Sequence, residues 1–94
     1  MALKTFVKDP DADKDYGVDW SGWLATGESI QTSTWLSTPS GLTLHDDAIV
    51  GAVPKTYVSG GAVGVVYTVT NRITTDANPA RTDDRSFLLK IEHQ

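Results

Sequence analysis

The densest group of side chains with chemical potential is an acidic segment near the start of the chain. An EF-hand calcium loop needs Asp or Asn at positions 1, 3 and 5, Gly at position 6 and Glu at position 12. The register that begins at Asp9 places Lys14 and Trp20 at positions 6 and 12, and the register that begins at Asp11 places Tyr16 and Gly22 there. A solvated acidic segment is the favoured interpretation, and a looser calcium site in a sandwich loop, as in a calcium-dependent adhesion module, is the alternative. The segment contains Asp9, Asp11, Asp13, Asp15 and Asp19.

No other pattern supports catalysis or a bound cofactor. The two histidines, His45 and His93, lack the third ligand and the HExxH spacing typical of zinc sites, and the chain has no cysteine. There is no GxSxG nucleophile motif. The glycine-rich residues 59–64 lack the GK[ST] of a phosphate-binding loop and lead into a strand pattern, so they indicate a tight turn between sheets. We therefore expect no catalytic, cofactor-binding or metal-binding residues, no cofactor and no enzymatic activity.

Two tryptophans lie close together, and two roles are open for each. Trp20 and Trp23 could fill the end of a hydrophobic core, because large aromatic side chains supply much of the buried area of a small domain. Either could instead be an exposed anchor for a partner protein, because Trp is enriched among interface hot spots.

The clearest structural signal lies in the last third of the chain. Residues 66–75 alternate strictly, with Tyr67, Val69, Asn71 and Ile73 on one face, which predicts a half-buried strand. Residues 86–92 alternate in the same way, so the two segments predict an antiparallel hairpin that forms the core. Tyr67, near the start of its strand, is either a tyrosine corner, whose hydroxyl fastens the preceding loop, or a simple core residue.

Earlier segments predict further strands. We expect an edge strand within residues 3–8, ended by Pro10, and a strand over residues 29–36. Residues 16–20 alternate and predict either a second strand or a segment that lies extended over a sheet. Ile30 and Trp35 have opposite parity, so burial of both requires a bulge between them. Residues 38–41 (TPSG) predict a turn, as do residues 25–28.

The middle of the chain is the least regular part. A strand over residues 42–44 is expected to stop at the sequence His45-Asp46-Asp47. Residues 49–53 and 56–58 predict either two short strands or one strand broken at Pro54. In total the chain predicts about seven short strands and no helix, the pattern of an all-β, antiparallel, immunoglobulin-like β-sandwich.

Length and charge narrow the classes of function. Ninety-four residues suit one domain spanning 1–94, with residues 1–9 as an extended or flexible N-terminal arm. The net charge of −4 argues against nucleic acid and anionic membranes as partners, since both favour a basic patch. There is no apolar run of membrane-spanning length and no signal-like segment, so synthesis in the cytoplasm of a cell is expected.

The chain contains the segments KDPDADKDYGVDWSGWL and SIQTSTWLSTPSGLT, the SGG before the penultimate strand, and the hairpin YTVTNRITT and RTDDRSFLLKIE. Together these segments resemble a family of small tailed-phage proteins, the fiber-tail adaptor or virion structural proteins of the neck and tail. The resemblance runs from about Lys8 to Ile91 and departs from the family pattern around residues 45–54. It implies a non-enzymatic structural role and provides no catalytic residues.

This resemblance implies a bacteriophage virion protein, made in the host cytoplasm, that docks on neck, tail or capsid proteins. We expect a ring-like multimer in the virion and a monomer when the chain is isolated, because such assemblies are cyclic. The alternative is a capsid decoration module or a carbohydrate-binding surface module. The candidate contact residues come from the Trp pair and from the loop at residues 74–84: Trp20, Trp23, Asp76, Asn78 and Arg81.

Overall fold

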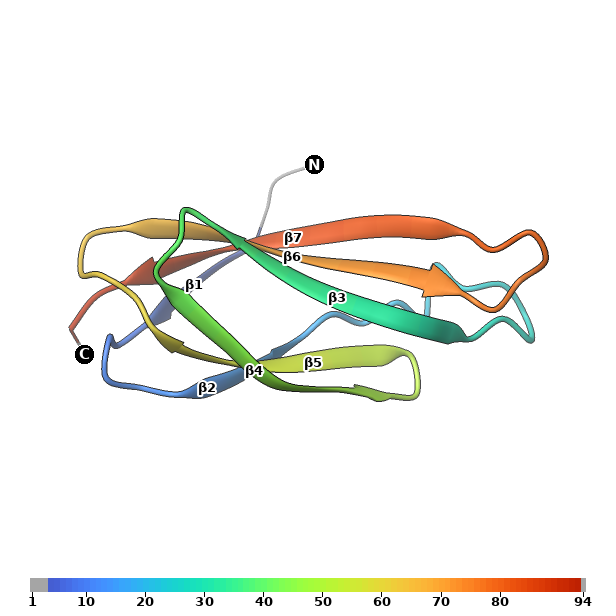
Figure 1. Ribbon diagram of the computed structural model, residues 1–94, viewed down its shortest axis with the longest axis horizontal. Coiled ribbons are helices and arrows are strands. Elements are labelled where there is room, and N and C mark those ends of the chain that lie inside the picture. Colours follow the sequence, from blue (N-terminus) through green and yellow to red (C-terminus); the bar gives the residue numbers. More distant parts are fainter. Residues whose placement is uncertain (1–3, 94) are drawn as a thin grey trace.

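Seven β-strands form two sheets in a computed structural model that describes residues 4–93. The strands are β1 (Thr5–Lys8), β2 (Lys14–Gly17), β3 (Ile30–Thr38), β4 (Leu42–Val50), β5 (Val53–Gly60), β6 (Val66–Thr75) and β7 (Thr82–Ile91). One sheet has the order β1-β7-β6-β3 and the other β2-β5-β4 (Figure 1). The described residues contain no helix and so none that could cross a membrane.

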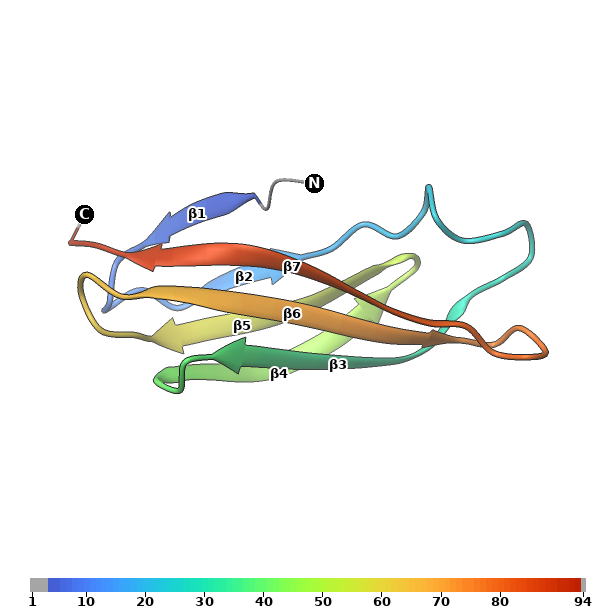
Figure 2. The same cartoon turned by 90° about the horizontal axis from the view of Figure 1, so that it is seen from above.

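The two sheets face each other as the layers of a sandwich whose strands run along its 44 Å long axis (Figures 1 and 2). Every strand pair is antiparallel except β1 with β7, which is parallel. The prediction of an all-β sandwich of about seven strands is therefore confirmed. The finer assignment to the immunoglobulin-like class stays a prediction; the orders β7-β6-β3 and β2-β5-β4 are compatible with the GFC and BED orders of that class.

The core lies where the alternating pattern placed it. Tyr67, Val69, Asn71 and Ile73 of β6 are buried, and Phe87, Leu89 and Ile91 of β7 are buried beside them. Val58 of β5 closes the core from the opposite sheet. The N-terminal half adds an aromatic contact, in which the Phe6 ring lies edge-on to Phe87 at 5.3 Å and also meets Tyr16 at 5.3 Å.

The glycine-rich turn before β6 is held by Tyr67. The Ala62 N–H donates to the Tyr67 hydroxyl at 3.0 Å, so this hydroxyl fastens the loop that precedes its own strand, as in a tyrosine corner. Gly61 has a φ of +101°, and a Cβ there would lie 2.7 Å from Ile91 Cγ1. The turn thus needs glycine for both its backbone conformation and its packing.

Strand β4 corrects the prediction for the middle of the chain. The strand does not stop at His45-Asp46-Asp47 but continues to Val50. Its ladder with β5 is irregular between His45 and Ala48, and Asp46 adopts a φ of +51°, a conformation that Asp tolerates better than most residues. The chain reverses at Gly51 and Ala52, so residues 49–53 are not one strand.

Pro54 does not break a strand, since it is the second residue of β5. Its carbonyl accepts a hydrogen bond from the Val18 N–H at 3.1 Å, just past the end of β2. The ladder between β2 and β5 covers only Lys55–Val58, so the residue without an N–H lies outside it. The bulge expected between Ile30 and Trp35 is confirmed as a register shift between Ile30 and Thr32.

The two ends of the chain compare differently with the prediction. The edge strand expected within residues 3–8 is confirmed as β1, which includes residues 5–8 of the expected arm and lies at an edge of the four-stranded sheet; residues 1–3 lie outside the described residues. Strand β7 begins at Thr82, earlier than the predicted residue 86, because Asp84 pairs with Arg72 of β6 through hydrogen bonds of 2.7 and 3.0 Å.

Candidate functional site

Two connections meet at one end of the sandwich and hold most of the predicted contact residues. One is the segment 18–29 between β2 and β3, and the other is the β6–β7 turn at residues 76–81. Both extend beyond the strands at the same end of the molecule (Figures 1 and 2). We call the group formed by Trp23, Glu28, Asp76 and Arg81 the end cluster.

Arg81 is the centre of the end cluster. Its guanidinium carbon lies 4.0 Å from the centroid of the Trp23 ring. Its Nε donates to Glu28 Oε2 at 3.0 Å, a terminal nitrogen donates to Glu28 Oε1, and the same nitrogen donates to the Trp23 carbonyl at 3.3 Å. This two-pronged contact with Glu28 fixes the guanidinium plane over the indole.

Glu28 supports Arg81 from a sheltered position. Its side chain is only 5% exposed, and its Oε1 also accepts the Ala25 N–H at 2.9 Å. The hydrogen bonds from Arg81 and then from Ala25 lower the pKa of the Glu28 carboxyl from 4.5 to about 2. The carboxylate is therefore charged at neutral pH and neutralises Arg81. Sequence reasoning missed Glu28; its place at the end of the predicted turn 25–28 was the available signal.

Contacts between Asp76 and Ser29 join the two connections, and Thr75 closes the β6–β7 turn itself. Asp76 Oδ1 accepts the Ser29 N–H at 2.8 Å, and the Asp76 N–H donates to the Ser29 carbonyl at 3.0 Å. The buried Thr75 hydroxyl accepts the Arg81 N–H at 3.0 Å. The end cluster is therefore built on ordered backbone rather than on a loose loop.

The five candidate contact residues have different surroundings. Trp20 is fully buried, and its Nε1–H donates to Asn71 Oδ1 at 2.9 Å, so its indole has no surface to offer a partner and its role is structural. Trp23 is half-buried and packs edge-on against Trp20 at 5.2 Å. Asn78 is exposed and has no side-chain hydrogen bond within residues 4–93. Asp76 and Arg81 belong to the end cluster, so the structure brings four of the five to one end.

A shallow hollow of about 400 Å³ lies beside the end cluster. Its walls are short side chains from both connections, together with the charged members: Ala25, Thr26, Gly27, Glu28, Asp76, Ala77, Pro79 and Arg81. The hollow is open to solvent; in its walls Glu28 and Arg81 are paired with each other, and Asp76 accepts the Ser29 N–H. Such a surface suits the reception of a partner's side chain rather than the enclosure of a substrate.

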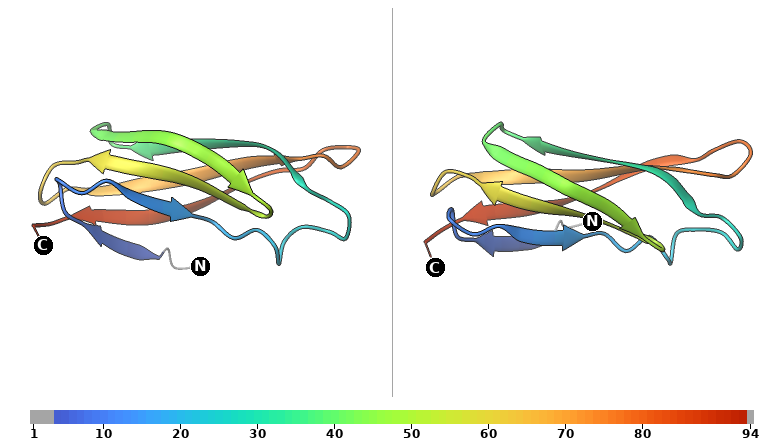
Figure 3. Two further views of the ribbon diagram at one scale, coloured as in Figure 1. Left: turned by 90° about the horizontal axis from the view of Figure 1, so that it is seen from below. Right: turned by 60° about the horizontal axis from the view of Figure 1, so that its bottom comes forward.

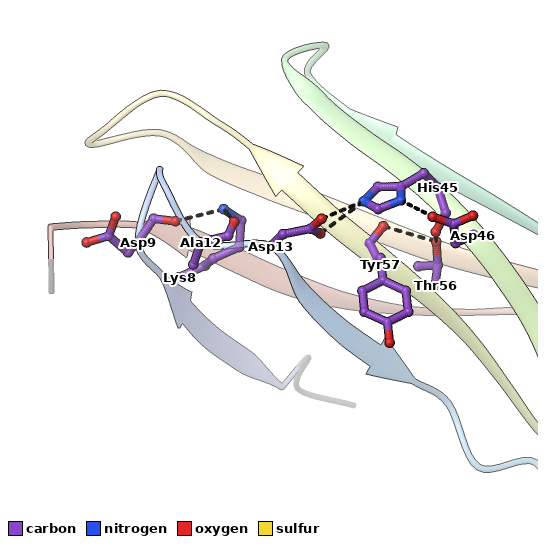
Figure 4. Close-up of polar contacts among 8 residues, drawn as sticks. All are labelled: Lys8, Asp9, Ala12, Asp13, His45, Asp46, Thr56 and Tyr57. Atoms are coloured by element: carbon purple, nitrogen blue, oxygen red, sulfur yellow. Dashed lines mark hydrogen bonds and ion pairs between the residues drawn. The ribbon is translucent and has the colours of Figure 1, made fainter.

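The acidic segment leads to a different group on the outer face of the three-stranded sheet (Figures 3 and 4). His45 Nε2 lies 3.0 Å from Asp13, and His45 Nδ1 lies 2.7 Å from Asp46. These two carboxylates raise the pKa of His45, with the contact to Asp46 the larger cause. The His45 ring also stacks with Tyr57 at 5.7 Å, so β4 is tied across β5 to the residue before β2.

The neighbouring Lys8 is fully buried and donates to the carbonyls of Asp9 and Ala12, each at 2.7 Å (Figure 4). Burial lowers the pKa of Lys8, against the opposing effect of the nearby aspartates. Lys8 therefore fastens the β1–β2 turn that carries the acidic segment. Across residues 4–93 no group of three or more His, Asp or Glu side chains is arranged to hold a metal ion.

Comparison with known proteins gives one family. No curated protein matches the chain. One family model, described as podophage GP4 fiber-tail adaptor protein gp77, matches residues 8–90 of the 94. The match includes all of the end cluster, the acidic segment and five complete strands, β2 to β6, and it includes residues 45–54, where the resemblance was weakest. The chain therefore belongs to the family of the podophage GP4 fiber-tail adaptor protein gp77.

Proposed function

We propose that this chain is a non-enzymatic structural protein of a phage virion that docks on neighbouring neck, tail or fiber proteins through the end cluster. Family membership supports an adaptor role in the phage tail. The observation that carries the proposed docking site is the Trp23–Arg81 stack, held by Glu28 at one end of the sandwich. The protein would then be located in the virion after synthesis in the host cytoplasm.

The composition of the end cluster fits a docking surface. Trp and Arg are enriched among the residues that dominate binding energy at interfaces. Arg81 is already oriented by Glu28 and by the Trp23 ring, so docking would cost little further side-chain entropy. Loops carried on a rigid sheet scaffold commonly provide binding residues.

The adaptor role also implies how copies are arranged. An adaptor at the tail axis would form a ring-like multimer with one copy at each symmetric position, and the isolated chain would be a monomer. The net charge of −4 favours protein partners over nucleic acid or an anionic membrane. A carbohydrate-binding or decoration role receives less support, because each of the three tryptophans is buried or half-buried and none is available as an open stacking platform.

The test is a binding experiment with the virion proteins encoded in the same genome. The purified chain is mixed with each neck, tail and fiber protein, and the mass of every mixture is measured by light scattering. We expect a complex of fixed stoichiometry with at least one of them. The adaptor function would be contradicted if the chain formed no complex with any of these proteins but bound sugars in a glycan screen or bound assembled capsids.

Two variants test whether the end cluster is the contact. Arg81→Ala removes the stacked cation, and Thr26→Lys places a long side chain over the hollow. Lys90→Ala is the matched control, because Lys90 also forms an ion pair, with Glu92 at 2.8 Å, but lies towards the opposite end of β7. We expect the first two variants to weaken the complex about tenfold or more and the control to leave it unchanged. Equal effects of all three would contradict this site.

A further inference from the structure

The four sheet edges of this protein are not equally protected against pairing with another chain. Strands β1 and β2 are edges of only four residues each. Edge strand β4 is interrupted between His45 and Ala48, where Asp46 and Asp47 lie. Short length, irregularity and charge are the usual means by which proteins prevent edge pairing.

Strand β3 has none of these protections over most of its length. It is an edge strand of nine residues, IQTSTWLST, without a charged residue or a proline. After the shift between Ile30 and Thr32, its register with β6 is regular from Thr32 to Thr38. Its backbone groups that face away from β6 therefore form a regular row of donors and acceptors, which is the template for an added strand.

A slot lies along the same edge, between the two sheets. It has a volume of about 210 Å³ and is lined by Ser33, Thr34, Trp35, Leu44, Asp47 and Thr56. Strands β3 and β4 belong to different sheets and are joined by the turn at residues 39–41, without pairing. This flank of the sandwich is therefore open, and a side chain from an added strand could enter it.

Two groups in the slot lining lack partners. Asp47 is exposed and forms no ion pair or side-chain hydrogen bond with the residues at 4–93. The Trp35 Nε1–H is the single buried side-chain polar atom without a hydrogen-bond partner in that range. Asp47 would be complemented by a basic side chain, and a polar side chain in the slot would bring an acceptor to the wall that contains Trp35.

We propose that the free edge of β3 binds an extended segment of another virion protein, which adds as a strand and carries a basic side chain opposite Asp47. This inference rests on the proposed adaptor function and assigns it a second contact surface. A second copy of this chain is the poorer occupant, because two-fold pairing of β3 with β3 brings no cation to Asp47. The unpaired backbone donors and acceptors of β3 would supply the affinity for an added strand, while Asp47 and the slot would select its side chains.

The first arm of the test uses overlapping synthetic peptides from the tail and fiber proteins of the same genome, each long enough to cover the nine residues of β3. We expect the bound peptides to contain Lys or Arg, and to slow hydrogen exchange at the β3 N–H groups that face away from β6. Thr34→Lys, which adds a charge to the edge, should abolish binding. Asp47→Asn should weaken binding about tenfold.

Matched variants separate the edge from general charge effects. Thr5→Lys adds the same charge to β1, the opposite edge of the same sheet, and Asp15→Asn removes the same charge from β2. Both should bind peptide normally. The inference is overturned if bound peptides leave β3 exchange unchanged, if the controls lose as much binding as Thr34→Lys, or if no peptide binds.

The second arm uses a whole virion protein that binds the chain. Slower exchange in β3 within that complex supports the edge site. A complex that depends on Arg81 but leaves β3 unprotected overturns the edge site and keeps the adaptor function. If no virion protein binds, the adaptor function fails, and the peptide arm decides the edge site separately. A dimer of the isolated chain with protected β3 would assign the edge to a second copy and also overturn the inference.

Discussion

Trp20 and Trp23 belong to one short segment, yet they lie in contrasting surroundings. Trp20 is fully buried, and its indole N–H is bound by Asn71, which is 51 residues away in the sequence. Trp23 is half-buried and lies beneath the guanidinium of Arg81 at the end of the sandwich. The surroundings of Trp20 are stabilised by apolar burial and one buried hydrogen bond, whereas those of Trp23 are stabilised by polar contacts that solvent can reach. The difference shows how one segment can both anchor the core and contribute a side chain to the proposed docking surface.

The largest expected effect comes from Trp20→Ala. Removal of a fully buried indole should lower the free energy of unfolding by about 3–5 kcal/mol, through lost burial and the cavity left behind. Trp23→Ala should cost about 1–2 kcal/mol, because it removes one aromatic contact and one cation–π contact at a partly exposed site. Urea unfolding measures both values. Equal costs would contradict the division into a core tryptophan and a surface tryptophan.

An intermediate effect is expected from Asn71→Leu. This change leaves the Trp20 Nε1–H buried without an acceptor and removes the donor to Ser33 Oγ at 2.8 Å. We expect a loss of about 1–3 kcal/mol in the free energy of unfolding. The double variant Trp20→Phe with Asn71→Leu serves as the control, because it removes both members of the hydrogen bond. Its cost should be less than the sum of the two single variants, and strict additivity would argue against the coupling.

The smallest expected effect is the acid response of the end cluster. The Glu28 pKa is lowered from 4.5 to about 2 in the folded chain, so its contribution to stability is complete above pH 4.5 and is lost as the pH falls towards 2. Because the cluster is at the surface, the loss should be local, seen as faster hydrogen exchange at residues 76–81 with little change in the unfolding midpoint.

Glu28→Gln should show that fast exchange already at neutral pH and respond little to acid. Glu92→Gln, at the other end of the molecule, should behave like the natural chain at residues 76–81. An acid response at residues 76–81 that is unchanged by Glu28→Gln would show that another group is responsible.

Regular alternation allowed much of the fold to be predicted from the sequence. The faces of β6 and β7 followed directly from period-two patterns, and the bulge in β3 followed from the opposite parity of Ile30 and Trp35. Strand β4 was harder, because His45-Asp46-Asp47 has poor strand propensity. His45 is held by pairing with Tyr57 of β5 and by its contact with Asp13, and the ladder with β5 resumes at Ala48 after the irregularity. Propensity is a weak guide when tertiary pairing opposes it.

The candidate site was predicted only in part. Trp23, Asp76 and Arg81 were predicted as contact residues in segments that connect strands, and the structure brings them together at one end of the sandwich. Glu28 was missed because its importance depends on Arg81, 53 residues later in the chain. Trp20 was selected beside Trp23, although it is buried, because spacing alone does not show which of two neighbouring indoles turns into the core.

The class of fold and the core strands can be predicted from sequence, because side-chain alternation is a local property that any strand must satisfy to bury one face. Membership in an adaptor family also follows from the sequence, through segments spread over the chain. Three features become visible only in the folded protein: which tryptophan is buried, how Glu28 orients Arg81, and which edge strand is left open. Each of them depends on contacts between residues far apart in the chain, and the local pattern of residue types does not show which distant residues meet.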